Sequence, residues 1–349
     1  MDKILEWWGE DRYFSTLDRI ERFWQGTGSD RFLVSIQSSQ YAYRQKFDKD
    51  KILQLVPKNL EAQAKLPGVN LPAFSPDFGT ISTAKYWGGS YGFDSTGGNI
   101  FIRPVQDHLD HLDALNPLPV DDPSMDAYKA IEIYHALSDM LQTDHLWLRT
   151  SDMQGVLNTA GLIVNQEELW MAMLSEPEKV TPFLDKVTEF LIRYAMYFRS
   201  QSNNKVCGNI WPYSALPSSI GWSITEDMMP LMSADLYRDF GLPYLRRISE
   251  AMGQLLVHCC GQYARHVPNI ISSGIEFAGF EHHESFTSLE SLRQLWGKTV
   301  LIPVSGAGFN HSAEYFEYCL SNTPSDTRFW FFFFDESESA VSFAKKYGF

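Results

Sequence analysis

The sequence has 349 residues, of which 44% are hydrophobic and 14% aromatic, so it can bury a large core. Its 43 acidic and 29 basic residues give a net charge of −14. This balance argues against a nucleic-acid or anionic-membrane surface, because both need clustered Lys and Arg. The expected partners are small molecules or other proteins.

The N-terminal segment and the cysteines indicate a cytoplasmic protein. The first ten residues are too acidic for a secretory signal, and no stretch reaches the roughly 20 apolar residues of a membrane span. The cysteines form a poor disulfide framework, since two of them are adjacent. They are Cys207, Cys259, Cys260 and Cys319.

The first half of the chain alternates predicted helices with short apolar strands. Helical periodicity covers residues 13–24, and residues 32–36 form the first predicted strand. Residues 1–30 are therefore expected to be an N-terminal helical extension. Further helices are predicted at 126–141, 166–175 and 177–199, and strands at 145–149 and 205–211.

Polar and aromatic side chains follow several of these segments, where a barrel of parallel strands places its ligand-binding loops. We interpret them as candidate substrate-binding residues, although each has a purely structural role as its alternative. They are Asp152, Gln154, Trp211, Tyr213 and Asp227.

The segment from Leu255 to Gly261 is a buried strand that stops at a turn. Side chains alternate along a strand, so His258 and Cys260 face one side and Cys259 the other. An imidazole and a thiolate that converge are suitable ligands for zinc, with at least one more ligand from elsewhere. The alternative is a buried cysteine and a hydrogen-bonded core histidine.

The remaining sequence repeats the same alternation. Strands are predicted at 275–280, 299–304 and 328–334, with helices between them and one helix capped by Ser233 and kinked at Pro243. About eight strand–helix units predict an α/β fold, a (β/α)8 TIM barrel over residues 31–349. The sequence lacks the Gly-x-Gly-x-x-Gly and Gly-x-x-x-x-Gly-Lys-Ser/Thr motifs, so it gives no support for nucleotide binding.

Three motifs together are similar to those of one enzyme family. They are Glu167-Glu168-Leu169 through Val180, Met232-Ser233-Ala234-Asp235-Leu236-Tyr237 with Pro243-Tyr244-Leu245, and His258-Cys259-Cys260-Gly261. Over roughly residues 70 to 335, the chain resembles the uroporphyrinogen decarboxylase superfamily, which includes corrinoid:thiol methyltransferases. The His-x-Cys-Gly motif is specific to the zinc-dependent methyltransferase branch.

The resemblance implies a zinc site in which His258 and Cys260 are ligands and Glu281, on the next strand, supplies another. The cysteine that this branch has after its last strand is absent, so Asp335 or Glu336 is the candidate replacement. The resemblance to the decarboxylase branch is weaker. Its catalytic Asp would correspond to Asp77, but its Arg-rich loop is reduced to Arg44.

The leading hypothesis is methyl transfer between a methylated small molecule or thiol and a corrinoid (cobalamin-type) cofactor carried by a partner protein. Glu281 and His282 are the candidate acid–base residues beside the metal, and a solvated loop is the alternative for His282. The rival hypotheses are uroporphyrinogen decarboxylation, a non-catalytic ligand-binding barrel and a purely structural zinc. Excess aromatics near both chain ends leave room for a homodimer interface.

Overall fold

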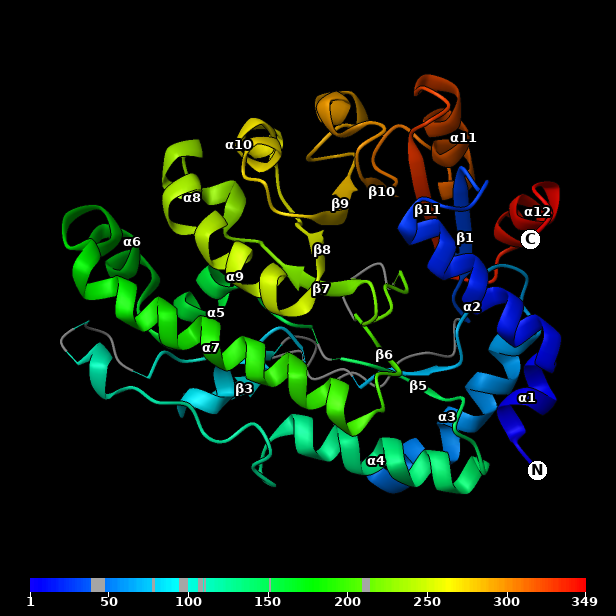
Figure 1. The fold of residues 1–349 in the computed structure, drawn as a ribbon, viewed down its shortest axis with the longest axis horizontal. Coiled ribbons are helices and arrows are strands. Elements are labelled where there is room, and N and C mark those ends of the chain that lie inside the picture. Colours follow the sequence, from blue (N-terminus) through cyan, green and yellow to red (C-terminus); the bar gives the residue numbers. More distant parts are fainter. Residues whose placement is uncertain are drawn as a thin grey trace.

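The computed structural model describes residues 1–38, 48–76, 79–93, 100–105, 109, 111–150, 152–208 and 214–349. Helices surround the strands, and both termini lie on the same side of the molecule (Figure 1). None of the helices in these ranges is long and apolar enough to cross a bilayer. Asp77, Trp211, Tyr213 and Arg44 lie outside the described residues.

The strands run mainly parallel. Their bounds are β1 Phe32–Ile36, β2 Ala73–Phe74, β3 Tyr91–Phe93, β4 Ile100–Ile102, β5 Trp147–Arg149, β6 Val206–Cys207, β7 Gly221–Thr225, β8 Gln254–His258, β9 Phe277–His283, β10 Val300–Val304 and β11 Arg328–Phe333. A six-stranded sheet has the order β1-β11-β10-β9-β8-β7, and a three-stranded sheet the order β2-β5-β6. Every pairing in these two sheets is parallel, whereas β3 and β4 form an antiparallel hairpin.

The α-helices follow the predicted alternation. Their bounds are α1 Lys3–Trp8, α2 Glu10–Gln25, α3 Lys49–Ala64, α4 Asp126–Leu141, α5 Val156–Ile163, α6 Gln166–Ser175, α7 Pro177–Gln201, α8 Ala234–Phe240, α9 Leu242–Met252, α10 Val267–Ser272, α11 Ser312–Asn322 and α12 Glu338–Lys346. A 3₁₀ helix, η5, covers Leu289–Leu295. The parallel α/β class predicted from the sequence is therefore confirmed.

Within the described residues, the parallel strands pair in two separate sheets and not in one continuous ring, so the predicted barrel is observed only in part. Backbone hydrogen bonds link segments that flank the three-stranded sheet to the outer strands of the six-stranded one. Val69 N, ahead of β2, donates to Val34 O of β1 at 2.8 Å, and Gly155 N, after β5, donates to Thr225 O of β7 at 2.7 Å. The ladder is interrupted around β2, which is two residues long and lies between Pro72 and Pro76. Proline has no backbone N–H for a ladder, so closure of all strands into one barrel stays a prediction.

Side-chain alternation along the strands builds two cores. On β11, Trp330 stacks on Trp24 of α2 at 5.4 Å, while Phe331 faces the other way and stacks on Phe316 of α11 at 4.5 Å. The inner core combines residues of β1, β2, β5, β6, β8, β9, β10 and β11 with Ile20, Phe23 and Trp24 of α2. The outer core fills the space between strands and helices.

Some local predictions were wrong for identifiable reasons. The predicted helix kinked at Pro243 is two helices, because Gly241 ends α8 and Pro243 lies in the first turn of α9, where its missing N–H costs nothing. The predicted helix at 288–296 is the 3₁₀ helix η5. β9 continues to His283, so Glu281 and His282 lie on a strand and not in a loop after it.

Candidate metal centre

The carboxyl end of β8 presents an imidazole and a thiol to each other. His258 is the last residue of the strand and is 5% exposed, whereas Cys260 lies just beyond it and is exposed. The Nε2 atom of His258 is 2.9 Å from the Cys260 Sγ. Cys259 points into the outer core, where burial raises the pKa of its thiol. The two side chains thus lie together, as strand alternation predicts.

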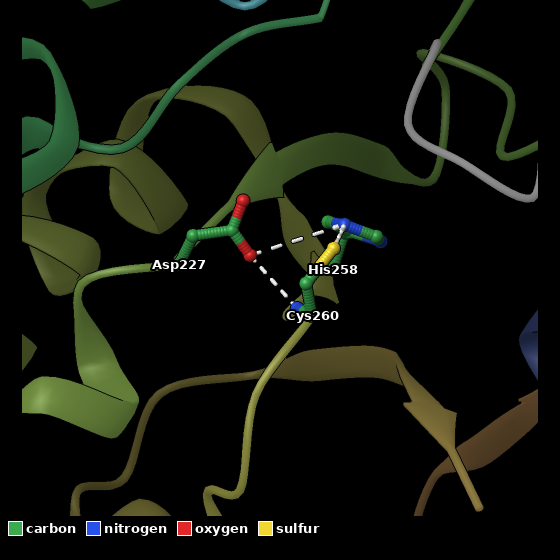
Figure 2. Close-up of side chains that lie close together, drawn as sticks. All are labelled: Asp227, His258 and Cys260. Carbon is green, nitrogen blue, oxygen red and sulfur yellow. Dashed lines mark hydrogen bonds and ion pairs between the residues drawn. The ribbon is translucent and has the colours of Figure 1, made fainter. Parts of the chain in front are cut away.

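A carboxylate from the neighbouring strand completes the group (Figure 2). Thr225 at the end of β7 pairs in register with His258, so Asp227 and Cys260 follow at the same level. The Asp227 Oδ1 accepts a hydrogen bond from the Cys260 backbone N at 2.8 Å and lies 3.9 Å from the His258 Nε2. One donor atom from each of Asp227, His258 and Cys260 lies within 4.8 Å of the others.

The other side of the imidazole contacts Glu281 of β9. The Glu281 Oε2 is 2.6 Å from the His258 Nδ1, and Glu281 is 1% exposed. The two atoms are at hydrogen-bond distance, but the angles at the contact are not those of a hydrogen bond. Burial opposes a charge on His258, but the Glu281 carboxylate and the Cys260 side chain raise the pKa of His258 well above its usual value. The ring therefore has a carboxylate on Nδ1 and the thiol and Asp227 on Nε2.

This donor set fits a zinc ion. Imidazole nitrogen, thiolate sulfur and carboxylate oxygen are the protein ligands of zinc, and catalytic zinc sites use three of them with one open position. A carboxylate on the far ring nitrogen is the usual partner of a metal-bound histidine, since it fixes the ring orientation. Among the described residues, Asp227, His258 and Cys260 can therefore hold the ion, with Glu281 behind His258.

Two predicted substrate-binding residues lie beside this group. Gln154 forms a parallel bridge with Thr225, the register partner of His258, and the Thr225 Oγ1 donates to the Asp152 Oδ1 at 2.6 Å. The Gln154 Oε1 accepts from Asn158 Nδ2 at 2.7 Å. Its Nε2 is buried and has no hydrogen-bond partner in the described part of the chain. The structure thus places an unused donor close to β7 and β8.

Two further predicted residues, His282 and Asp335, lie away from this group. His282 faces away from His258, because it alternates with Glu281, and its Nε2 is 3.0 Å from the Tyr315 hydroxyl of α11. Asp335 is exposed, accepts from Ser337 N at 3.0 Å and is not part of the group of three. Nothing is described for Asp77, Trp211 and Tyr213.

Glu226 is a site residue that the sequence analysis did not single out. It is 2% exposed, accepts from the Tyr237 hydroxyl at 2.9 Å, and its backbone N donates to His258 O at 2.8 Å. Burial raises its pKa to about 8. A Cβ on Gly155 would lie 1.8 Å from the Glu226 carboxylate, so any larger residue here would force the buried Glu226 side chain to shift. The sequence signal was an acidic pair, Glu226-Asp227, directly after an apolar strand.

Comparisons with known proteins found two similar proteins, both described as methyltransferases. No family model matches the chain. Over 123 residues it is 28% identical to a methylated-thiol–coenzyme M methyltransferase of Methanosarcina mazei, a match that covers 35% of this chain and 30% of that relative. A solved structure described as a methyltransferase from Methanosarcina mazei matches with a TM-score of 0.67 over 95% of this chain and 98% of that one. At 13% identity this second match shows a shared fold.

Proposed function

We propose that the protein is a zinc-dependent methyltransferase that moves a methyl group between a methylated small molecule or thiol and a corrinoid carried by a partner protein. The observation that carries the proposal is the group of nitrogen, sulfur and oxygen donors from Asp227, His258 and Cys260 at the carboxyl ends of β7 and β8. The methyltransferase-like fold and the segment related to a thiol methyltransferase support it.

Each residue of the group has a distinct role in this proposal. Asp227, His258 and Cys260 hold the metal, which when bound lowers the pKa of a thiol so that a thiolate exists at neutral pH. Glu281 orients the His258 ring from the opposite side through the 2.6 Å contact with Nδ1. The Gln154 Nε2, buried and without a partner among the described residues, is available to donate to a polar group of the substrate.

In this proposal Asp227 replaces, as a metal ligand, the cysteine that is missing after the last strand. A carboxylate and a thiolate each carry one negative charge, so Asp227 with Cys260 neutralises a divalent ion as two thiolates would. Asp335 and Glu336, the alternative replacements expected from the sequence, are both exposed and outside the group. Three protein ligands leave one coordination position for substrate, which is the arrangement of a catalytic zinc and not of a structural one.

We also infer that the strands close into one barrel, with residues 1–30 as a helical extension that covers its amino-terminal end. The inner core supports this, because residues from most strands of both sheets meet in it together with three α2 side chains. The strand ends that carry the metal group then lie at the carboxyl-terminal face, where barrel enzymes bind their substrates.

The test is methyl transfer by the zinc-loaded protein. Methylcobalamin is supplied with a panel of thiols, and the loss of its visible absorption is followed; the reverse direction uses methylated thiols and amines with reduced cobalamin. We expect transfer in one direction, with loss of at least 100-fold in Cys260→Ala. Cys259→Ala is the matched control, since this neighbouring thiol is buried on the opposite face. Absence of transfer in both directions, or an unchanged rate in Cys260→Ala, would overturn the proposal.

A further inference from the structure

A buried hydrogen-bond network lies on the outer face of β9, behind the metal group. The His282 Nε2 is 3.0 Å from the Tyr315 hydroxyl, which in turn donates to the Glu284 Oε2 at 2.5 Å. The same oxygen of Glu284 accepts from Leu289 N at 2.8 Å. His282 and Tyr315 are both fully buried. The network thus connects the end of β9, the turn after it, η5 and α11.

The proton positions in this network follow from its partners. The hydroxyl of Tyr315 has one hydrogen, and its 2.5 Å contact with the Glu284 carboxylate takes that hydrogen. His282 must then donate from Nε2 to the Tyr315 oxygen, which leaves its Nδ1 without a proton. The Nδ1 has no partner within the described ranges, and burial lowers the pKa of His282 to about 3, so the ring is neutral. A neutral imidazole that is held in this way is suited to fixing a strand rather than to transferring protons.

The strand places this network one residue from Glu281, which contacts the His258 ring of the metal group. Glu281 and His282 are neighbours on β9, and alternation directs Glu281 to His258 and His282 to α11. The backbone of Glu281 is held a second time, because the Tyr263 hydroxyl donates to its carbonyl at 2.9 Å. The Glu281 carboxylate lies 2.6 Å from the imidazole, so a shift of this strand end changes that contact.

We propose that His282 and Tyr315 are positioning residues that fix the end of β9 and thereby hold the Glu281 carboxylate against the metal-binding histidine. The inference rests on the proposed zinc site and deepens it. It reassigns His282, which the sequence suggested as an acid–base residue, to a role that acts through Glu281. Removal of a group that contacts a metal ligand directly changes metal affinity by about 10- to 100-fold, and a residue that acts through Glu281 is expected at the lower end of that range.

The experiment measures zinc affinity by competition with a chromophoric chelator. Tyr315→Phe keeps the ring and removes the hydroxyl, and we expect it to weaken zinc binding by about 10-fold. His282→Leu should do the same, whereas His282→Gln keeps an N–H donor and should restore most of the affinity. Tyr318→Phe is the control, since Tyr318 stacks on Tyr315 at 6.2 Å and is 41% exposed.

A second measurement separates positioning from general stability. If Tyr315 acts through Glu281, the Tyr315→Phe change should have no further effect on zinc affinity in a Glu281→Gln background. Equal zinc affinity in the wild type and Tyr315→Phe, or full additivity of the two changes, would overturn the inference. Failure of the wild type itself to bind zinc would instead overturn the proposed function. Thermal melting of the metal-free proteins identifies variants that do not fold. If Tyr315→Phe does not fold, the zinc affinities of His282→Gln and His282→Leu are compared instead.

Discussion

The role of Asp227 gives the sharpest prediction, because its carboxylate is both a proposed ligand and a hydrogen-bond acceptor. Asp227→Asn keeps an oxygen that can accept from Cys260 N, at 2.8 Å in the wild type, but removes the charge. The free energy of zinc binding to zinc-finger peptides is roughly 10–16 kcal/mol for four ligands, which is about 3 kcal/mol for each ligand. The Asp227 side chain is 35% exposed, so water replaces part of the lost ligand. About 2 kcal/mol remains, which is about a 30-fold loss of zinc affinity.

The assay is isothermal titration of metal-free protein with zinc, checked by chelator competition. Asp335→Asn is the matched control, because this exposed carboxylate is the ligand that the sequence suggested and it lies outside the group of three. We expect its zinc affinity to equal that of the wild type. The reasoning is refuted if Asp227→Asn binds zinc as tightly as the wild type, or if Asp335→Asn is the weaker binder.

Three other predictions concern the ring partner, an N-terminal cap and the outer core. Glu281→Gln should weaken zinc binding about 10- to 100-fold with an unchanged circular dichroism spectrum; unchanged affinity would argue against an orienting role. Burial raises the pKa of Asp2, but hydrogen bonds from His145, Leu5 N and Thr143 lower it overall, so its stabilisation is present above about pH 4 and lost as pH falls. Urea unfolding should show Asp2→Ala, which removes the side-chain cap of α1, less stable than the wild type by about 1 kcal/mol at pH 6, with the difference shrinking towards pH 3. Phe331→Ala should cost about 3–5 kcal/mol in the same assay, because it removes the ring stacked on Phe316; a cost below about 1 kcal/mol would contradict the packing.

The sequence predicted those parts of the fold in which a local pattern determines the structure. The strand 32–36 and the helices 126–141 and 166–175 have the expected bounds, because their apolar spacing is regular. The strand Gly221–Thr225 was not predicted, since Gly221 and Ser223 interrupt its β-forming residues. It becomes a strand through burial between β8 and residues 153–155, contacts that no local pattern records.

The candidate site was predictable where it depends on one strand and not where it depends on several. Alternation along β8 was enough to pair His258 with Cys260. The sequence suggested Glu281 as a further ligand and Asp335 or Glu336 in place of the missing cysteine, whereas the structure groups Asp227, from just after the adjacent strand, with His258 and Cys260. Register between strands decides which acidic residue lies near the metal group, and a single sequence does not contain that register.

X-ray absorption of the zinc-loaded protein tests the central claim most directly, because it counts the sulfur atoms bound to the metal. The proposed site requires one zinc–sulfur distance at about 2.3 Å and nitrogen or oxygen ligands at about 2.0–2.2 Å. In Cys260→Ala the sulfur signal should disappear, while Cys259→Ala should keep it. A zinc ion with no sulfur neighbour, or with several, would contradict a centre built from Asp227, His258 and Cys260.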